Sequence, residues 1–180
     1  GGEYHFLFAN SRRDFLTAGV VEALSIILPE RKDVELYEVV PRMDSFAIAY
    51  AFLDSLLWRD PSTICVDKIK YFVNNVVLKY EYTAELLWDV VLQVSAIPNH
   101  PLNAIWLDKH LNNFSMADRD AWWTQWLKKH YYPNTTIDKI IQLGYNANCS
   151  DKTTIKLICI TLAWFHTSTN RELRDRSTKA

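Results

Sequence analysis

Apolar and polar positions along the chain recur with the three- and four-residue spacing of amphipathic helices. No stretch shows the alternation of a half-buried strand, and residues 4–8 are left open between strand and helix. The spacing predicts eight or nine helices and one short helical turn. Their approximate ranges are 14–28, 34–40 (the turn), 44–57, 61–80, 83–95, 102–111, 115–127, 137–143, 151–165 and 170–180. The sequence therefore predicts an all-α fold.

Capping residues and prolines mark the boundaries of these helices. Asp60 and Pro61 pair an N-cap with a proline at the first helical position. Ser115 and Asp118 resemble a capping box, with Asp in place of the usual Glu or Gln. Gly144 is predicted as the residue that follows the end of a helix. Further predicted boundary residues are Pro29, Pro41, Asp44, Thr83, Pro98, Pro101, Asn112, Asn113, Ser150 or Asp151, and Asn170.

The same spacing predicts which side chains face inward. The segment 44–57 is apolar nearly all round, so we expect its helix to be central. For the first helix the predicted inward residues are Leu16, Val20, Ala23, Leu24 and Ile27. For the next two long helices they are Phe46, Ala49, Tyr50, Leu53, Leu56 and Leu57, then Val66, Ile69, Val73, Val76 and Tyr80.

Short connections between consecutive helices favour antiparallel helical hairpins. Successive hairpins begin near residues 44, 83, 115 and 151, at intervals of 39, 32 and 36 positions. These intervals lie near those of two-helix repeats. We therefore expect residues 1–180 to form one helical-repeat block, an irregular α-solenoid of the HEAT or TPR kind. A compact helical bundle is the alternative.

Composition narrows the functional classes. Apolar residues make up 49% of the chain and aromatic residues 13%, which excludes a disordered chain. The 20 basic and 21 acidic residues leave a net charge of −1, so the basic excess of nucleic-acid-binding modules is missing. Gly19 and Gly144 are the glycines beyond the first two residues, and no phosphate-binding loop, nucleophile elbow or kinase signature occurs.

Cysteine usage and the apolar runs bear on the compartment. Cys65, Cys149 and Cys159 are widely spaced and odd in number, which is typical of a reduced, cytoplasmic protein. The longest apolar run, 155–165, contains Lys156 and is too short to span a bilayer, so no membrane partner is expected.

The tryptophans are the strongest candidate for a functional group. Four of the seven lie within residues 100–127. Trp122, Trp123 and Trp126 share a helix face by their spacing and, together with Arg119, form a candidate interaction surface that could stack on a base or a peptide. The other interpretation, which the weight of aromatic residues in protein cores favours, is that these rings fill the joint between two helical hairpins.

Other polar residues give no catalytic, cofactor-binding or metal-binding candidate. His100, His110, His130 and His166 lack metal-ligand spacing, and His100 fits a corner residue that hydrogen-bonds its turn. The carboxylates of Asp118 and Asp120 stand two positions apart and point to different helix faces, which disfavours a paired acid and base. The charges of residues 171–179 interleave as on a solvated helix face.

The segment HPLNAIWLDKHLNNFSMADRDAWWTQWL, residues 100–127, resembles part of large bacterial STAND-type (NACHT-like) P-loop ATPases, several of which act in antiviral defence. The resemblance rests on HPLNA before a leucine-rich short helix and on S-M-x-x-R-D-x-W-W. Two further segments are similar to the same family: FLTAGVVEALSIILPER at 15–31 and TSTNRELRDRSTKA at 167–180. The resemblance implies that this chain is a helical region C-terminal to the ATPase module.

The resemblance implies a non-catalytic α-solenoid that recognises a trigger or restrains the ATPase. Its partner would be a protein trigger or another domain of the same chain, and ATP would be bound elsewhere in a longer protein of which this chain is a part. Because the phosphate-binding loop is missing, no ATPase residue is assigned to any position here. A nucleic-acid-binding helical-repeat protein is the alternative function.

Overall fold

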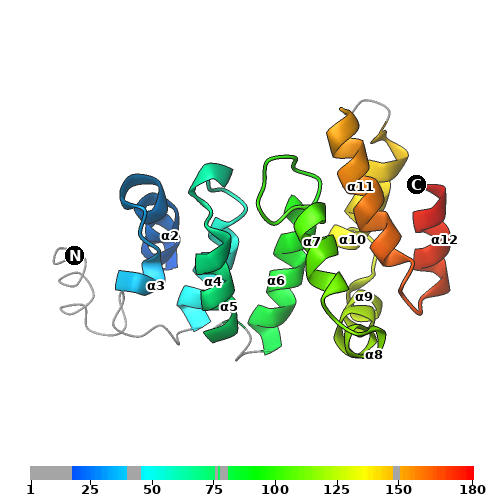
Figure 1. Ribbon diagram of the computed structural model, residues 1–180, viewed down its shortest axis with the longest axis horizontal. Coiled ribbons are helices and arrows are strands. Elements are labelled where there is room, and N and C mark those ends of the chain that lie inside the picture. The colour runs from blue at the N-terminus through cyan, green and yellow to red at the C-terminus, as the bar shows by residue number, and fades with distance from the viewer. Residues whose placement is uncertain (1–17, 40–45, 76, 78–80, 148–150) are drawn as a thin grey trace. The chain divides into compact units, whose positions relative to one another are not determined.

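Figure 1 shows the computed structural model, which describes residues 18–39, 46–75, 77, 81–147 and 151–180. Every regular element in these ranges is helical, so the predicted all-α class is confirmed. Residues 4–8, whose structure was left open, lie outside the described part. The α-helices are α2 (Ala18–Lys32), α3 (Leu36–Val39), α4 (Phe46–Ser55), α5 (Val66–Asn75), α6 (Glu81–Val94), α7 (Ala104–Asn112), α8 (Met116–Arg119), α9 (Gln125–His130), α10 (Thr136–Tyr145), α11 (Lys152–Phe165) and α12 (Arg171–Lys179).

The chain divides into two compact units, Gly1–Val90 and Val91–Ala180, and the division falls within α6. Each unit is described by itself. The single helical block over residues 1–180 stays a prediction.

In the first unit, α2 packs against α4, and α3 contacts both helices. The core contains an aromatic cluster. The Tyr37 ring stacks on Phe72 with centroids 4.5 Å apart and meets the edge of Phe52 at 5.9 Å. Phe52 and Phe72 are almost completely buried. Burial of aromatic rings of this size dominates the energetics of a small core.

The predicted inward face of α2 is wrong. Val20 and Ile27 are exposed, whereas Val21, Ser25 and Leu28 are buried. Apolar residues surround this helix almost completely, so the spacing alone allows more than one inward face. Of the other predicted inward residues, Ala23 is exposed, Leu24 is half-buried and Leu16 lies outside the described part.

The prediction that Pro29 ends α2 is also wrong, since the helix continues to Lys32. A proline removes one backbone donor but keeps its acceptor, and the Pro29 carbonyl accepts a bond of 3.1 Å from the Asp33 N–H. Asp33 has a φ of 52°. This left-handed residue occupies the position that usually ends a helix.

Helix α4 is buried on several sides, in agreement with its predicted central place. Its predicted inward face is wrong in part, because Phe46 and Tyr50 are exposed and Ile48 and Phe52 are buried instead. The predicted cap Asp44 lies outside the described residues, as does Pro41 beyond the short helix α3. An all-round apolar helix gives the periodicity little to distinguish its faces.

The predicted continuous helix over 61–80 is broken. Asp60 does act as an N-cap, accepting a bond of 2.8 Å from the Ser62 N–H, but only the 3-10 turn Pro61–Thr63 follows it. The buried Arg59 guanidinium donates to the Thr63 carbonyl at 2.7 Å. That carbonyl is thereby diverted from a helical ladder, and the chain runs extended at Ile64.

In α5, Ile69 is buried as predicted, while Val66 is exposed, Val73 is half-buried and Phe72 takes the inward place. Val76 and Tyr80 lie outside the described residues. Thr83 does not cap a helix, because α6 starts at Glu81. The Thr83 hydroxyl instead donates to the Val77 carbonyl at 2.7 Å.

In the second unit, α11 packs against α7, α10 and α12. Four helices begin at polar N-caps whose side-chain oxygens accept backbone N–H groups, which satisfies donors that a helix start leaves open. These caps are Asn103, Ser115, Asp151 and Asn170. The predicted starts at Ser115, Asp151 and Asn170 are confirmed.

Gly144 lies inside α10 and does not follow its end, so its predicted role is wrong. A Cβ at this position would lie 2.9 Å from the Ala180 Cβ and 3.0 Å from Leu162 Cδ1. Its backbone is not left-handed. Glycine here permits close approach of α10 to α11 and to the residue after α12.

Several buried hydroxyl groups bond within their own helix. Ser25 donates to the Val21 carbonyl at 2.9 Å, Thr161 to the Leu157 carbonyl at 3.1 Å, and Ser177 to the Leu173 carbonyl at 2.8 Å. Each reaches the carbonyl four residues earlier, which satisfies a polar group that burial would otherwise penalise.

Among the described residues, no helix combines the length and apolarity that crossing a membrane requires.

Candidate interaction surface

The candidate residues Arg119, Trp122, Trp123 and Trp126 lie on one continuous helix, formed by α8, a π-helical turn at Asp120–Thr124, and α9. Its start matches the predicted capping box in part. The Asp118 N–H donates to Ser115 Oγ at 3.2 Å, and that hydroxyl donates to Asp118 Oδ2 at 2.7 Å. The π-helical turn was not predicted from the sequence.

Burial divides the four candidate residues into two pairs. Trp123 and Trp126 are 0% and 7% exposed. Arg119 and Trp122 are half-buried. The first pair has little surface to offer a partner, whereas the second pair reaches the outside of the unit. A binding role of the four residues stays a prediction.

The tryptophans belong to a longer run of rings, here called the aromatic chain. Consecutive rings have centroids 4.6–6.3 Å apart. In order they are Trp106, His110, Phe114, Trp122, Trp123, Trp126 and His130. Offset stacks and edge-to-face contacts at these distances stabilise beyond simple burial. The chain of rings joins α7 to the helix that carries the candidate residues.

Sequence reasoning missed three members of the aromatic chain that precede the tryptophan pair. Trp106, His110 and Phe114 are spaced four residues apart, which places their rings on one side of α7 and of the turn after it. That spacing was a usable signal. His130 follows Trp126 by the same interval, and their rings stack at 4.6 Å.

The guanidinium group of Arg119 packs against another helix of the second unit. Its guanidinium lies over the Trp164 ring, 5.0 Å from the centroid, and its buried Nε has no hydrogen-bond partner among the described residues. Trp164 in turn donates from Nε1 to Asp108 Oδ1 at 3.0 Å. A cation over an indole face is an attractive contact. Arg119 therefore ties its helix to α11 and is less available to a partner than the sequence suggested.

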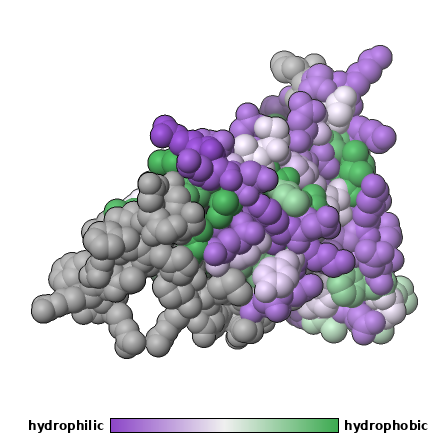
Figure 2. All heavy atoms as spheres, turned by 60° about the vertical axis from the view of Figure 1, so that its left-hand side comes forward, coloured by the Kyte–Doolittle hydropathy of each residue, from purple (hydrophilic) through white to green (hydrophobic). Residues whose placement is uncertain are grey.

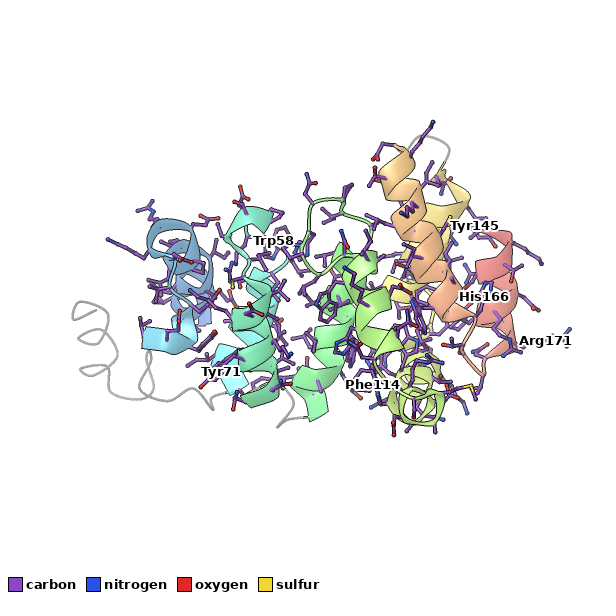
Figure 3. All side chains as sticks on the ribbon, in the orientation of Figure 1. Trp58, Tyr71, Phe114, Tyr145, His166 and Arg171 are labelled. Atoms are coloured by element: carbon purple, nitrogen blue, oxygen red, sulfur yellow. The ribbon has the colours of Figure 1, made fainter. Side chains whose placement is uncertain are left out.

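The aromatic chain reaches the surface near its middle, at Phe114 and Trp122. Phe114 is 36% exposed and Met116 is 70% exposed, and the half-buried Trp122 meets the Phe114 ring edge-on at 5.3 Å. We call these three residues the aromatic edge. Figure 3 shows Phe114 where α7 passes into α8. On the face drawn in Figure 2, hydrophilic residues predominate and hydrophobic ones gather in separate small areas.

Three histidines of the second unit, His100, His110 and His130, take part in local structure. The Leu102 N–H donates to His100 Nδ1 at 3.1 Å, which confirms His100 as a corner residue. Burial lowers the pKa of His110 below its usual value. His130 Nδ1 lies 2.9 Å from the Trp126 carbonyl oxygen. Among the described residues, no group of three His, Cys, Asp or Glu side chains is placed to hold a metal ion.

The charged helix α12 is partly tied into the unit. Arg176 donates to the Tyr131 hydroxyl at 2.8 Å and lies 2.7 Å from Asp138 Oδ1. The bond to Tyr131, together with Asp138, raises the pKa of Arg176. Arg171 and Asp175, in contrast, form an exposed pair at 3.6 Å, as expected of a solvated face.

The first unit has its own exposed rings. Phe46 lies 6.4 Å from Tyr50 and 5.5 Å from Tyr82, and all three are exposed. The aromatic edge differs from them because buried stacked rings stand behind it. It offers apolar contact on a fixed support and brings no set of convergent acid and base groups. Comparison with protein-family models, with curated proteins and with solved structures finds no match for this chain.

Proposed function

We propose that this chain is a non-catalytic helical-repeat segment that contacts a protein partner through the aromatic edge, Phe114, Met116 and Trp122. The observation that carries the proposal is the exposure of this edge where the aromatic chain passes from Phe114 to Trp122, next to the buried Trp123. Tryptophan is enriched among the residues that dominate protein interfaces.

Preorganisation favours such a contact. The Trp122 ring is flanked by Phe114 at 5.3 Å and by Trp123 at 6.3 Å. A side chain that is already fixed loses less conformational entropy when a partner binds. Met116, two residues after Phe114 in the sequence, is strongly exposed and flexible, so it can adapt to an irregular partner surface.

We further propose that the segment belongs to a bacterial STAND-type ATPase and recognises a trigger or restrains the ATPase. Support comes from the roles of the residues that carry the resemblance. In HPLNA, His100 forms the corner and Asn103 caps α7. In S-M-x-x-R-D-x-W-W, Ser115 caps the helix and the tryptophan pair lies in the π-helical turn. Both motifs thus fall on local structure that depends on those residue types.

Within this proposal, the helices stack as an irregular α-solenoid of antiparallel hairpins, with a compact bundle as the alternative. ATP binds to a module outside this segment, in a cytoplasmic protein of antiviral defence. The partner is a protein trigger or another domain of the same chain.

The reading frame of the gene tests the family. A P-loop ATPase module encoded upstream in the same frame would support the proposal. A start codon near residue 3 would contradict it.

The contact surface is tested in the full-length protein by Met116→Glu, with Tyr132→Glu as the control. Both side chains are strongly exposed in the second unit, so neither substitution disturbs the core. A charge on the aromatic edge should either raise basal ATP hydrolysis, if the edge restrains the ATPase, or abolish its activation by the trigger. Hydrolysis that is unchanged in both respects, and equal to that of the control, would refute the contact role.

A further inference from the structure

Three aromatic rings of the first unit form an exposed cluster that the proposed function does not use. Phe46 and Tyr50 lie four residues apart on α4, with their ring centroids 6.4 Å apart, and Tyr82 of α6 lies 5.5 Å from Phe46. The three side chains are 46%, 36% and 58% exposed. Aromatic residues are enriched at protein interfaces, so a contiguous group of exposed rings is a candidate contact surface.

A carboxylate continues the same side of α4. Asp54 follows Tyr50 by four residues, which places the side chains of Phe46, Tyr50 and Asp54 in one row along the helix. Asp54 is half-buried, and its carboxylate has no hydrogen-bond or ion-pair partner among the described residues. We call Phe46, Tyr50, Asp54 and Tyr82 the acidic aromatic face.

The two helices that carry this face are negatively charged. The sequences of α4 and α6 contain no lysine or arginine, and their carboxylates include Asp54, Glu85 and Asp89. Such a charge repels phosphate groups, which disfavours nucleic acid as the ligand of these rings. It attracts cations, and the face of an aromatic ring attracts them as well. The rings and the carboxylate therefore favour the same kind of ligand.

Two arginines of the second unit show how a cation binds to rings in this chain. The Arg176 guanidinium lies 5.9 Å from the centroid of the Tyr131 ring and 2.7 Å from Asp138 Oδ1. The Arg119 guanidinium lies 5.0 Å from the centroid of the Trp164 ring. A guanidinium suits such places better than an ammonium group, because its plane stacks on a ring while its edge donates to an oxygen. The acidic aromatic face offers the same combination of ring and carboxylate, on helices without a cation of their own.

We propose that the acidic aromatic face binds an arginine-bearing segment of a protein partner. The guanidinium stacks on the exposed rings and donates to the Asp54 carboxylate, and the hydroxyl groups of Tyr50 and Tyr82 are further acceptors. This inference goes beyond the proposed function, because the acidic aromatic face belongs to the first unit and the aromatic edge to the second.

The probe is the capped peptide Gly-Arg-Gly-Arg-Gly, titrated into isotope-labelled protein and followed by NMR. Arginines two positions apart lie about 6.6 Å from each other in an extended peptide, close to the distances between the neighbouring rings. The peptide should shift the signals of Phe46, Tyr50 and Tyr82. The same peptide with citrulline, a neutral analogue of arginine, should bind about tenfold more weakly, because it lacks the attraction of a cation to the rings and to the carboxylate.

Substitutions locate the binding site. Asp54→Asn and Tyr82→Ala should each weaken binding of the arginine peptide about threefold. The matched controls Asp67→Asn and Tyr71→Ala change an exposed carboxylate and an exposed ring of the first unit outside the face, and they should leave binding unchanged. All four side chains are at least partly exposed, so these substitutions do not put folding at risk.

Three results would overturn the proposal: equal binding of the arginine and citrulline peptides, no shift at the three rings, or equal effects of the face and control substitutions. Tighter binding of Gly-Pro-Pro-Pro-Gly would also overturn it, in favour of a polyproline segment. Self-association that Tyr82→Ala abolishes would overturn it in favour of a second copy of the chain. The Met116→Glu experiment reports on a different unit and a different readout, so failure of either surface leaves the test of the other unaffected.

Discussion

Arg59 and Glu35 form a bidentate ion pair in the first unit, with N···O distances of 2.9 and 2.8 Å. Their side chains are 0% and 3% exposed. Removing one partner of such a pair leaves an uncompensated buried charge. Arg59→Met should therefore destabilise the protein by about 3–5 kcal/mol in chemical denaturation.

The double variant Arg59→Met, Glu35→Leu should recover much of that stability, since apolar replacements of similar volume often match a buried ion pair. Arg31→Met, at an exposed position of α2, serves as the control and should change stability little. If Arg59→Met has the same free energy of unfolding as this control, the expected destabilisation is contradicted.

The buried tryptophans should behave as core residues. Trp123→Ala is expected to lower the free energy of unfolding by about 3–5 kcal/mol, because the side chain is fully buried and leaves a cavity. Trp58→Ala, at a strongly exposed tryptophan of the first unit, should stay within about 0.5 kcal/mol. Near-parental stability of Trp123→Ala, combined with lost partner binding, would move this residue to the contact surface.

Two glycine substitutions should act in opposite directions. Gly19→Ala adds a methyl group in open space within α2 and should stabilise by up to about 1 kcal/mol through better helix propensity. Gly144→Ala places its Cβ 2.9 Å from the Ala180 Cβ, so the clash should outweigh the gain and lower stability. Thermal unfolding of both variants measures the contrast. A stabilised Gly144→Ala variant would show that Ala180, at the end of α12, moves aside at little energetic cost.

Stability of the second unit should depend on the protonation of His110. Burial lowers its pKa in the folded state, so the unfolded chain binds more protons below the unfolded pKa of about 6.5. Stability is therefore present at neutral pH and is lost as the pH falls below about 6.5. Urea midpoints across this range measure the effect. His110→Phe, which keeps a ring in the aromatic chain, should reduce the loss, and an equal loss in both proteins would assign it to other groups.

Nucleic-acid binding, the alternative function, predicts affinity that falls steeply with salt. The net charge of −1 and the inward turn of Arg119 lead us to expect weak binding and a shallow slope. A titration of labelled DNA and RNA between about 50 and 200 mM salt measures both quantities. Tight binding with a steep slope would favour the alternative over the protein-contact role.

Local signals in the sequence were enough for the helix starts. Ser115, Asp151 and Asn170 were identified because a capping side chain bonds to backbone only two or three residues away. The same holds for the corner at His100. Such features depend little on what the rest of the chain does.

Features set by distant residues escaped prediction. The helix over 61–80 is broken because Arg59 is held by Glu35, 24 positions earlier, and reaches the Thr63 carbonyl. Gly144 serves close packing with Ala180, 36 positions later in the sequence. Trp122 was expected on the same helix face as Trp123 and Trp126, but it is half-buried while they are buried, and a π-helical turn contains the first two residues. The regular spacing of an α-helix does not include such a turn.

The inward hydroxyl groups of Ser25, Thr161 and Ser177 have a consequence for how such a chain can evolve. Because each is satisfied within its own helix, these positions impose no directional bond on the neighbouring helix. At such places the contact between helices is fixed by shape and volume alone. Apolar residues that contact each other across two helices can then be exchanged in compensating pairs, and no buried polar group loses its hydrogen bond. Exchanges of this kind keep the packing, whereas positions at caps and turns require particular residue types.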